Sequence, residues 1–178
     1  GNREDIENVL RSDAGGIGLF RSEFLYMENR HKLPTEEQQF QTYKLAAEAM
    51  GAKRVVIRTA DLGGDKQAEC LDLGEENNPA MGYRGIRISL DKDEMFKTQL
   101  RAILRASVFG NVSIMLPMIT SLAEVQSAKV MLEAAKRELK DEKTAFDEDI
   151  QVGVMIETPA AVMISGELAR EVDFFSIG

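Results

Sequence analysis

Three ionisable side chains in this sequence stand directly after short apolar runs. Arg21 follows GIGLF, Arg58 follows RVVI and Glu157 follows GVMI. Such runs are typical of buried strands, and parallel α/β folds place their chemistry beyond the carboxyl ends of their strands. If the three runs belong to one parallel sheet, two guanidinium groups and one carboxylate would lie on the same rim.

Two further stretches add charge to this region. RTADLGGDK follows the second apolar run, and besides Arg58 and a pair of glycines it contains Asp61, Asp65 and Lys66. The stretch NPAMGYRGIR supplies Arg84 and Arg87. The connection between them is long and polar for a loop that joins a strand to a helix, which indicates a functional insertion.

These residue types suit a phosphorylated carboxylic acid. The planar fork of arginine matches the oxygens of phosphate or carboxylate groups, and arginine is costly to bury without a partner. A glutamate in the same mouth would repel an anionic substrate unless a cation such as Mg²⁺ lay between them. Two arginines and one metal-binding carboxylate are therefore a suitable set for such a substrate.

A structural role is open for the same charges. Arg21 could pair with Glu23 in an ion pair that caps the rim. Arg58 could likewise pair with Asp61 or Asp65. The glycine pair is more typical of a tight turn than of a phosphate-binding loop, and it matches neither a P-loop nor a dinucleotide fingerprint.

Three other residues favour structural interpretations. Arg87 leads directly into a predicted helix and is interpreted as structural. His31, the one histidine, lies in a polar stretch and is expected to be exposed to solvent. Cys70, the one cysteine, forbids an internal disulfide and a cysteine-based zinc cluster, and nothing supports a redox or nucleophilic role for it.

The overall composition limits the partners and the location. The formal net charge of −8 argues against nonspecific binding of nucleic acid or anionic membranes as the main task. No apolar run approaches the roughly 20 residues of a membrane span, and the first residues do not form a signal peptide. We expect a cytoplasmic protein without membrane insertion.

The positions of the charged residues depend on a predicted α/β fold. Strands are predicted at residues 17–20, 55–57, 112–118, 152–156 and 174–177, where apolar residues occupy both faces.

Helices are predicted between these strands and at the opening residues. Thr35 is expected to cap a helix that ends at Gly51, and Asp91 is expected to cap a second helix. Ser121 with Glu124 has the spacing of a capping box for a third helix. Thr158 is expected to cap a fourth helix that runs to about Arg170.

This order predicts a parallel sheet in an incomplete (β/α)₈ barrel, because a complete barrel takes roughly 250 residues. About five of the eight strands would be present, and residues 1–178 would form a single partial domain. Both ends of the sequence look cut, with about one strand missing in front and two behind. Strands left without a neighbour favour association, so a homo-oligomer is expected.

Six motifs in this order resemble phosphoenolpyruvate–protein phosphotransferase, enzyme I of the bacterial sugar phosphotransferase system. They are GIGLFRSEFLYM, RTADLGGDK, NPAMGYRGIR, MLPMI, GVMIETPAA and VDFFSIG, and they extend over essentially the whole chain. The related pyruvate phosphate dikinases and phosphoenolpyruvate synthases are less similar in the RTADLGGDK loop.

The resemblance implies a barrel domain that binds phosphoenolpyruvate (PEP). By the pattern of the family, Arg21, Arg58 and Arg84 match the arginines that bind PEP, and Glu157 matches one of two Mg²⁺ ligands. Arg58 is expected to hold the phosphoryl group, while the aspartates, the lysine and the glycines of its loop brace it. In this family the phosphoryl group passes to a histidine on a separate N-terminal domain and then to the carrier protein HPr.

Several parts of the family pattern are absent from these residues. They include the phosphorylated histidine, the cysteine that protonates the enolate, and an Asn-Asp pair that follows the last motif and supplies the second metal ligand. We therefore expect the 178 residues alone to be inactive. The alternatives are a fragment of a dikinase or synthase, and a noncatalytic PEP-binding module.

Overall fold

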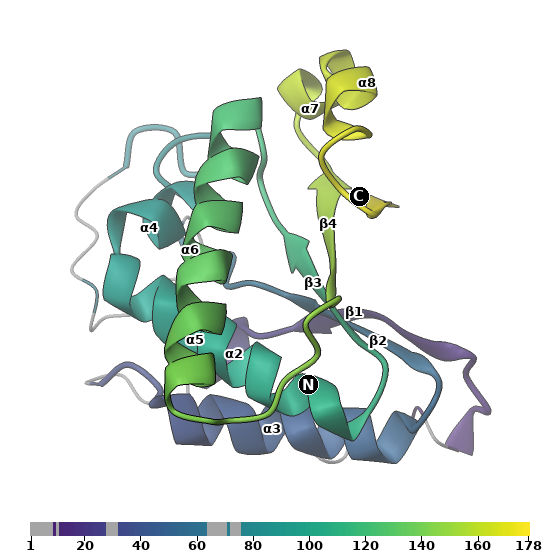
Figure 1. Ribbon diagram of the computed structural model, residues 1–178. Coiled ribbons are helices and arrows are strands. Elements are labelled where there is room, and N and C mark those ends of the chain that lie inside the picture. The colour runs from purple at the N-terminus through teal and green to yellow at the C-terminus, as the bar shows by residue number, and fades with distance from the viewer. Residues whose placement is uncertain (1–8, 10, 28–31, 64–70, 72–75) are drawn as a thin grey trace.

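The fold is a curled parallel sheet. The computed structural model describes residue 9 and residues 11–27, 32–63, 71 and 76–178. Within them the strands are β1 (Gly16–Arg21), β2 (Arg54–Arg58), β3 (Val112–Leu116), β4 (Gln151–Ile156) and β5 (Phe174–Ile177). They form a parallel sheet in the order β1-β2-β3-β4-β5, which curls like half of a barrel (Figure 1). The predicted strands and the incomplete α/β barrel are confirmed.

The strand register places Arg21 and Arg58 side by side at the carboxyl ends of their strands. Arg21 at the end of β1 lies beside Arg58 at the end of β2. Arg58 in turn lies beside Met115 on β3. Because all the strands are parallel, the residues that follow them emerge on the same rim.

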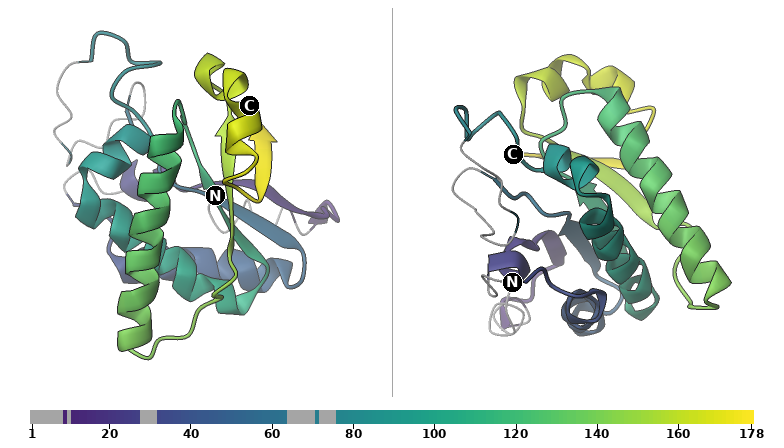
Figure 2. Two further views of the ribbon diagram at one scale, coloured as in Figure 1. Left: turned by 45° about the horizontal axis from the view of Figure 1, so that its top comes forward. Right: turned by 90° about the vertical axis from the view of Figure 1, so that its left-hand side faces the viewer.

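Helices cover one face of this sheet. They are α2 (Glu23–Met27), α3 (Glu36–Met50), α4 (Ile86–Asp91), α5 (Asp93–Ala106), the 3₁₀ helix η2 (Ser107–Phe109), α6 (Leu122–Asp141), α7 (Pro159–Met163) and α8 (Ser165–Leu168). Helix α5 packs between α3 and α6, and these three long helices line one side of the sheet (Figures 1 and 2). From β1 onward the predicted order of strands and helices is observed, with two additional short helices, α2 and α4.

The predicted helix caps are confirmed at three of four positions. Thr35 and Ser121 each form a capping box, and Thr158 accepts a hydrogen bond from the Ala161 N–H at the start of α7. Asp91 was a wrong prediction. It ends α4, and its carboxylate accepts a hydrogen bond from the Tyr83 hydroxyl, while α5 begins after Lys92.

The predicted fourth helix is also shorter than expected. Ile164 has φ −104° and ψ 19°, which lie outside the helical range, so the segment divides there into α7 and α8. The sequence contains no proline at this point that would have indicated the break.

The two faces of the sheet carry different side chains because successive residues of a strand point to opposite sides. Val55, Ile57, Ile114 and Val154 belong to the large core that the helices share. A second, smaller cluster contains Val56, Met115 and Met155, with Leu19 and Phe174 packed against it. Arg58 follows Ile57 directly, so its side chain points to the opposite face of the sheet. This is the face of the smaller cluster, and it corresponds to the interior of a barrel.

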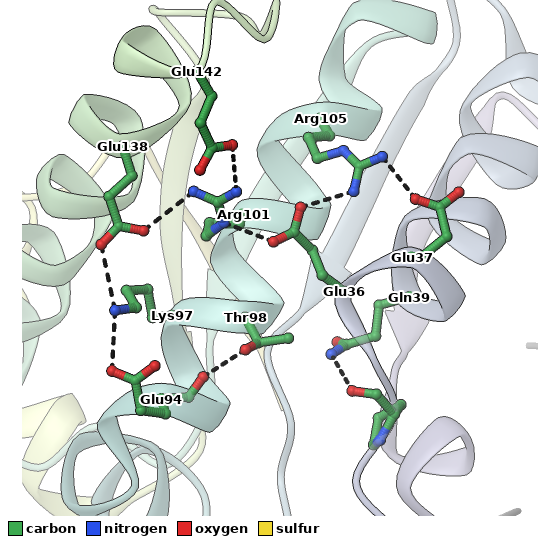
Figure 3. A network of polar contacts seen from close by, with 11 residues as sticks. Glu36, Glu37, Gln39, Glu94, Lys97, Thr98, Arg101, Arg105, Glu138 and Glu142 are labelled. Carbon is green, nitrogen blue, oxygen red and sulfur yellow. Dashed lines mark hydrogen bonds and ion pairs between the residues drawn. The ribbon is translucent and has the colours of Figure 1, made fainter.

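An ion-pair network joins the three long helices α3, α5 and α6 within the helix layer (Figure 3). Arg101 of α5 contacts Glu36 of α3 at 2.6 Å, Glu138 of α6 at 3.1 Å and Glu142 at 2.7 Å. The hydrogen bond and charge of Arg101 hold the pKa of Glu142 below its ordinary value. Networks of this kind stabilise more than isolated surface pairs, so the helix layer is held together by charge as well as by its apolar core.

A second polar network lies buried between the helices and the end of β2. The Gln99 side chain on α5 accepts a hydrogen bond from the Ala60 N–H at 2.9 Å and donates to the Ser22 and Tyr43 hydroxyls, each at 3.0 Å. The Ser22 hydroxyl donates to the Arg58 carbonyl at 2.8 Å. Helix α5 therefore fixes the backbone that carries Arg58.

Replacing Gln99 by leucine is expected to destabilise the protein strongly. The change leaves the buried Ala60 N–H without its acceptor, at a cost of about 1–3 kcal/mol, and removes the donor that the Ser22 and Tyr43 hydroxyls share. Urea denaturation measures the loss as a lower midpoint. Gln41→Leu is the control, because Gln41 is an exposed residue of α3 and its replacement is expected to change stability by no more than about 0.5 kcal/mol. Equal midpoints for the two variants would contradict this role of Gln99.

Candidate functional site

Arg58 is the most deeply buried of the predicted site residues, with 5% of its surface exposed. Its Nη2 donates to Glu23 Oε1 at 2.8 Å and lies 3.4 Å from Asp61 Oδ2. Its Nη1 lies 3.9 Å from Met155 Sδ, a weak acceptor. Its Nε is buried and has no hydrogen-bond partner among the described residues. A buried N–H without a partner is costly, so this donor is a candidate contact for a ligand.

Asp61 connects Arg58 to Arg84. Its two carboxylate oxygens accept from Arg84 Nε at 2.9 Å and from Arg84 Nη2 at 3.0 Å, in the bidentate geometry that favours strong pairing. Glu23 Oε1 also accepts from the Asp61 N–H at 3.0 Å. We call Glu23, Arg58, Asp61 and Arg84 the rim cluster. Its formal charges balance, as buried charges require.

Two glycines allow the segment that carries Arg84 to reach the rim. Gly63 has φ +110°, and a Cβ there would lie 2.8 Å from the Tyr83 carbonyl oxygen. Gly85 has φ +58°, and a Cβ there would lie 2.9 Å from Met118 Cγ. The Gly85 N–H donates to the Leu62 carbonyl at 2.8 Å. Glycine is needed at both positions because of the positive φ and the close backbone approach.

Arg21 lies on the same rim but is exposed. It ends β1 directly beside Arg58 in the strand register. The alternative in which Arg21 pairs with Glu23 is wrong, because Glu23 pairs with Arg58. Within the described residues no ion pair neutralises the exposed Arg21.

Glu157 follows β4 and connects to the rim cluster through Met118. Glu157 Oε1 accepts from the Met118 N–H at 2.8 Å. Met118 has φ 56°, an uncommon value for a residue other than glycine, and its side chain packs against Gly85. Glu157 is therefore placed beyond the end of β4, with Met118 and Gly85 between it and Asp61.

The described residues offer an incomplete set of metal ligands. They contain no group of three or more His, Cys, Asp or Glu side chains arranged to hold a metal ion. Glu157 is half-buried, and one of its oxygens already accepts a hydrogen bond. Mg²⁺ prefers six oxygen ligands, so Glu157 fits as a single contributor, with the other ligands coming from elsewhere.

Arg87 has the structural role that its position predicted. It donates to the Met81 carbonyl at 2.8 Å and to the Met118 carbonyl at 3.4 Å, and it lies 3.7 Å from the Glu124 carboxylate. These contacts hold the loop before α4 against the end of β3.

Glu76 holds the other side of the same loop. Its carboxylate accepts from the Asn78 N–H at 2.8 Å and from the Tyr83 N–H at 2.7 Å. These backbone hydrogen bonds hold the pKa of Glu76 below its ordinary value of 4.5. Because Tyr83 precedes Arg84, Glu76 helps to place Arg84 at the rim.

Acid is expected to release this loop. A lowered pKa means that the contribution of Glu76 to stability is complete above its ordinary pKa and is lost as the pH falls through the lowered value. An NMR titration of the Asn78 and Tyr83 amide signals should therefore show a midpoint below 4.5. Glu76→Gln should abolish this titration. A midpoint at or above 4.5 in the unchanged protein would contradict the contacts of Glu76.

The remaining predictions fall partly outside the structure. Gly64, Asp65, Lys66, His31 and Cys70 lie outside the described residues, as does most of the predicted opening helix.

Two contributions to the site were missed by sequence reasoning, namely the pairing of Glu23 with Arg58 and the buried network at Gln99. A signal existed for Gln99, which is a polar residue on the apolar stripe formed by Phe96, Leu100 and Ile103.

In the part of the chain that the structure describes, no helix combines the length and the apolarity that a bilayer span requires.

Comparison with known proteins identifies similar sequences over the full length of the chain. Residues 1–178 match the family described as PEP-utilising enzyme, PEP-binding domain. The chain is 51% identical to the phosphoenolpyruvate-protein phosphotransferase of Staphylococcus carnosus (strain TM300) and 52% identical to that of Haemophilus influenzae. Each alignment contains 100% of this chain and 31% of the relative, so the chain spans less than a third of these relatives. The resemblance predicted from the motifs is confirmed.

Proposed function

Because the chain belongs to the PEP-binding domain family of PEP-utilising enzymes, we propose that it is part of a cytoplasmic phosphoenolpyruvate–protein phosphotransferase. The intact protein that carries this sequence transfers the phosphoryl group of PEP to one of its own histidines and then to the carrier protein HPr during sugar uptake. The 178 residues supply the PEP site. They do not complete a reaction alone, because the phosphorylated histidine and the proton-donating cysteine lie outside them.

The observation that carries this proposal is the unpartnered Nε of Arg58. A buried guanidinium group at the end of a barrel strand keeps an N–H donor without an acceptor among the described residues. A phosphoryl oxygen is a suitable acceptor because charge-assisted hydrogen bonds to arginine are short and strong. PEP combines such oxygens with a carboxylate that the neighbouring arginines can also bind.

The arginines divide the work of binding and catalysis. Arg58 binds the phosphoryl group, with Arg84 beside it through Asp61 and Arg21 on the exposed side. Phosphoryl transfer depends mainly on positioning and on stabilising charge that spreads over the transferring oxygens. Guanidinium groups held in place by carboxylates supply that charge without reorganising during the reaction.

Glu157 is proposed as one ligand of Mg²⁺. A bound Mg²⁺ ion would stabilise charge on the phosphoryl oxygens and on the enolate leaving group. The second protein ligand is expected in the Asn-Asp segment that follows the last motif in the family. Glu157 Oε1 accepts from the Met118 N–H, so the other carboxylate oxygen is the one that would bind the ion.

The assay of the intact protein with PEP, Mg²⁺ and HPr tests the function. Phosphorylated HPr and pyruvate are expected in equal amounts. Formation of PEP that requires ATP would instead identify a dikinase or a synthase. Binding of PEP with neither reaction would identify a noncatalytic module, and absence of PEP binding would refute the proposal.

Self-association is proposed from the sheet edges. Strands β1 and β5 each have one neighbour in the described sheet, and unpaired strand edges favour pairing between chains. Light scattering of the 178-residue chain, in which these edges have no further strand of the described sheet beside them, is expected to show a dimer or a larger oligomer. A monomer over the whole working concentration range would contradict this expectation.

A further inference from the structure

We infer that Glu23 is a positioning residue that directs Arg58 at the phosphoryl group, an inference that rests on the proposed function. Glu23 belongs to the short helix α2, 35 residues before Arg58 in the sequence, and 3% of its surface is exposed. The inference concerns how Glu23 acts on Arg58, because nothing places Glu23 itself in contact with a substrate.

One oxygen of Glu23 holds both the side chain and the backbone of the loop that follows β2. Oε1 accepts from Arg58 Nη2 at 2.8 Å and from the Asp61 N–H at 3.0 Å. The Arg58 guanidinium is therefore fixed relative to the backbone three residues further along. The adjacent Ser22 hydroxyl donates to the Arg58 carbonyl at 2.8 Å, which fixes the start of the same loop.

The geometry of the guanidinium group makes this contact directional. Its N–H donors lie in one plane in a rigid fork. Once Glu23 holds Nη2, the directions of Nε and Nη1 are set as well. Nε has no partner among the described residues and Nη1 contacts only the thioether of Met155 there, so Glu23 leaves these two donors for a ligand.

Glu23 is better suited to this role than Asp61. Asp61 lies 3.4 Å from Arg58 Nη2, and both of its oxygens are engaged by Arg84. Glu23 makes the shorter contact with Arg58, at 2.8 Å. Asp61 therefore mainly holds Arg84, and Glu23 mainly holds Arg58.

This division predicts a loss that depends on the chemistry of the ligand. In the proposed site the phosphoryl group lies on Arg58 and the carboxylate on the neighbouring arginines. A phosphorylated ligand therefore depends on the directed donors of Arg58 more than a small dicarboxylate does. Phosphoglycolate and oxalate are suitable probes, because one carries a phosphoryl group and a carboxylate and the other carries carboxylates alone. General damage to the domain would weaken the binding of both.

The experiment is a calorimetric titration of the intact protein with each probe in the presence of Mg²⁺. Glu23→Ala is expected to weaken phosphoglycolate binding by roughly 10- to 100-fold, the equivalent of one charge-assisted hydrogen bond, and oxalate binding by less than about twofold. Glu23→Gln keeps an acceptor oxygen for Arg58 and should recover most of the lost affinity. If the alanine variant does not fold, Glu23→Gln carries the test, because the loss of the negative charge should still weaken phosphoglycolate binding more than oxalate binding.

Glu138→Gln is the matched control. It removes a carboxylate that pairs with Arg101 at 3.1 Å in the helix network (Figure 3), near the C-terminal end of α6, and that makes no contact with the rim cluster among the described residues. Both probes should bind this variant as they bind the unchanged protein. Equal weakening of both probes in the Glu23 variants, or no weakening of either, would overturn the inference. Failure of the unchanged protein to bind phosphoglycolate would overturn the proposed function itself.

Discussion

Replacing Arg58 by methionine in the intact protein is expected to weaken phosphoglycolate binding by at least about 100-fold and to reduce HPr phosphorylation to background. Methionine keeps an apolar stem of similar length but removes every N–H donor. The phosphoryl oxygens then lose the contact that is proposed to hold them, and no other described residue offers a buried guanidinium at the end of β2.

The same change is expected to lower stability, because Glu23 and Asp61 lose a shared cation. Breaking a buried ion pair from one side costs about 3–5 kcal/mol. Arg58→Lys separates the two effects, because lysine keeps the positive charge without the planar fork. The lysine variant should regain much of the stability but little of the phosphoglycolate affinity. Activity of the methionine variant within threefold of the unchanged protein would contradict the role of Arg58.

Replacing Asp61 by asparagine has the second large expected effect. The amide nitrogen of asparagine would face a guanidinium donor of Arg84 in place of one carboxylate oxygen, and two cations would share less negative charge. The free energy of unfolding is expected to fall by about 3–5 kcal/mol. Urea denaturation measures this change, and PEP affinity should fall with it because Arg84 is no longer held at the rim.

Asp13→Asn provides the comparison for this prediction. Asp13 pairs with Lys53 at 3.4 Å, but its side chain is fully exposed. Exposed pairs of this kind contribute little to stability, so the Asp13 variant should unfold almost as the unchanged protein does. Similar unfolding midpoints for the Asp61 and Asp13 variants would show that the rim cluster is not the strong buried network described above.

The charged residues at the rim show why structural and functional interpretations of one residue need not exclude each other. The sequence left open whether Arg58 is a structural ion pair or a substrate contact. In the structure Arg58 pairs with Glu23 and Asp61, yet its Nε lacks a partner among the described residues. Burial of a cation requires counter-ions, and the rigid fork still leaves donors for a ligand.

Local sequence patterns were sufficient to predict the strands and the residues at their ends. Arg21, Arg58 and Glu157 follow directly from apolar runs, so a parallel sheet places them on one rim. A short run that is apolar on both faces is a local property of the sequence, and this is why the positions could be predicted to within a residue or two.

Contacts between distant segments could not be predicted in this way. Arg84 reaches the rim because the Gly85 N–H pairs with the Leu62 carbonyl, and Glu23 finds Arg58 across 35 residues of sequence. Neither contact leaves a periodic trace in the sequence. The wrong prediction of Asp91 as a helix cap has the same origin. Its carboxylate accepts from the Tyr83 hydroxyl in the preceding loop, and local sequence does not indicate that contact.

The most direct test of the site is a crystal structure of the intact protein with phosphoglycolate and Mg²⁺. A phosphoryl oxygen is expected about 2.7–3.2 Å from Arg58 Nε, with Glu23 still bound to Nη2. A ligand bound elsewhere, with the Arg58 Nε still lacking an acceptor, would contradict the central claim that this rim binds the phosphoryl group.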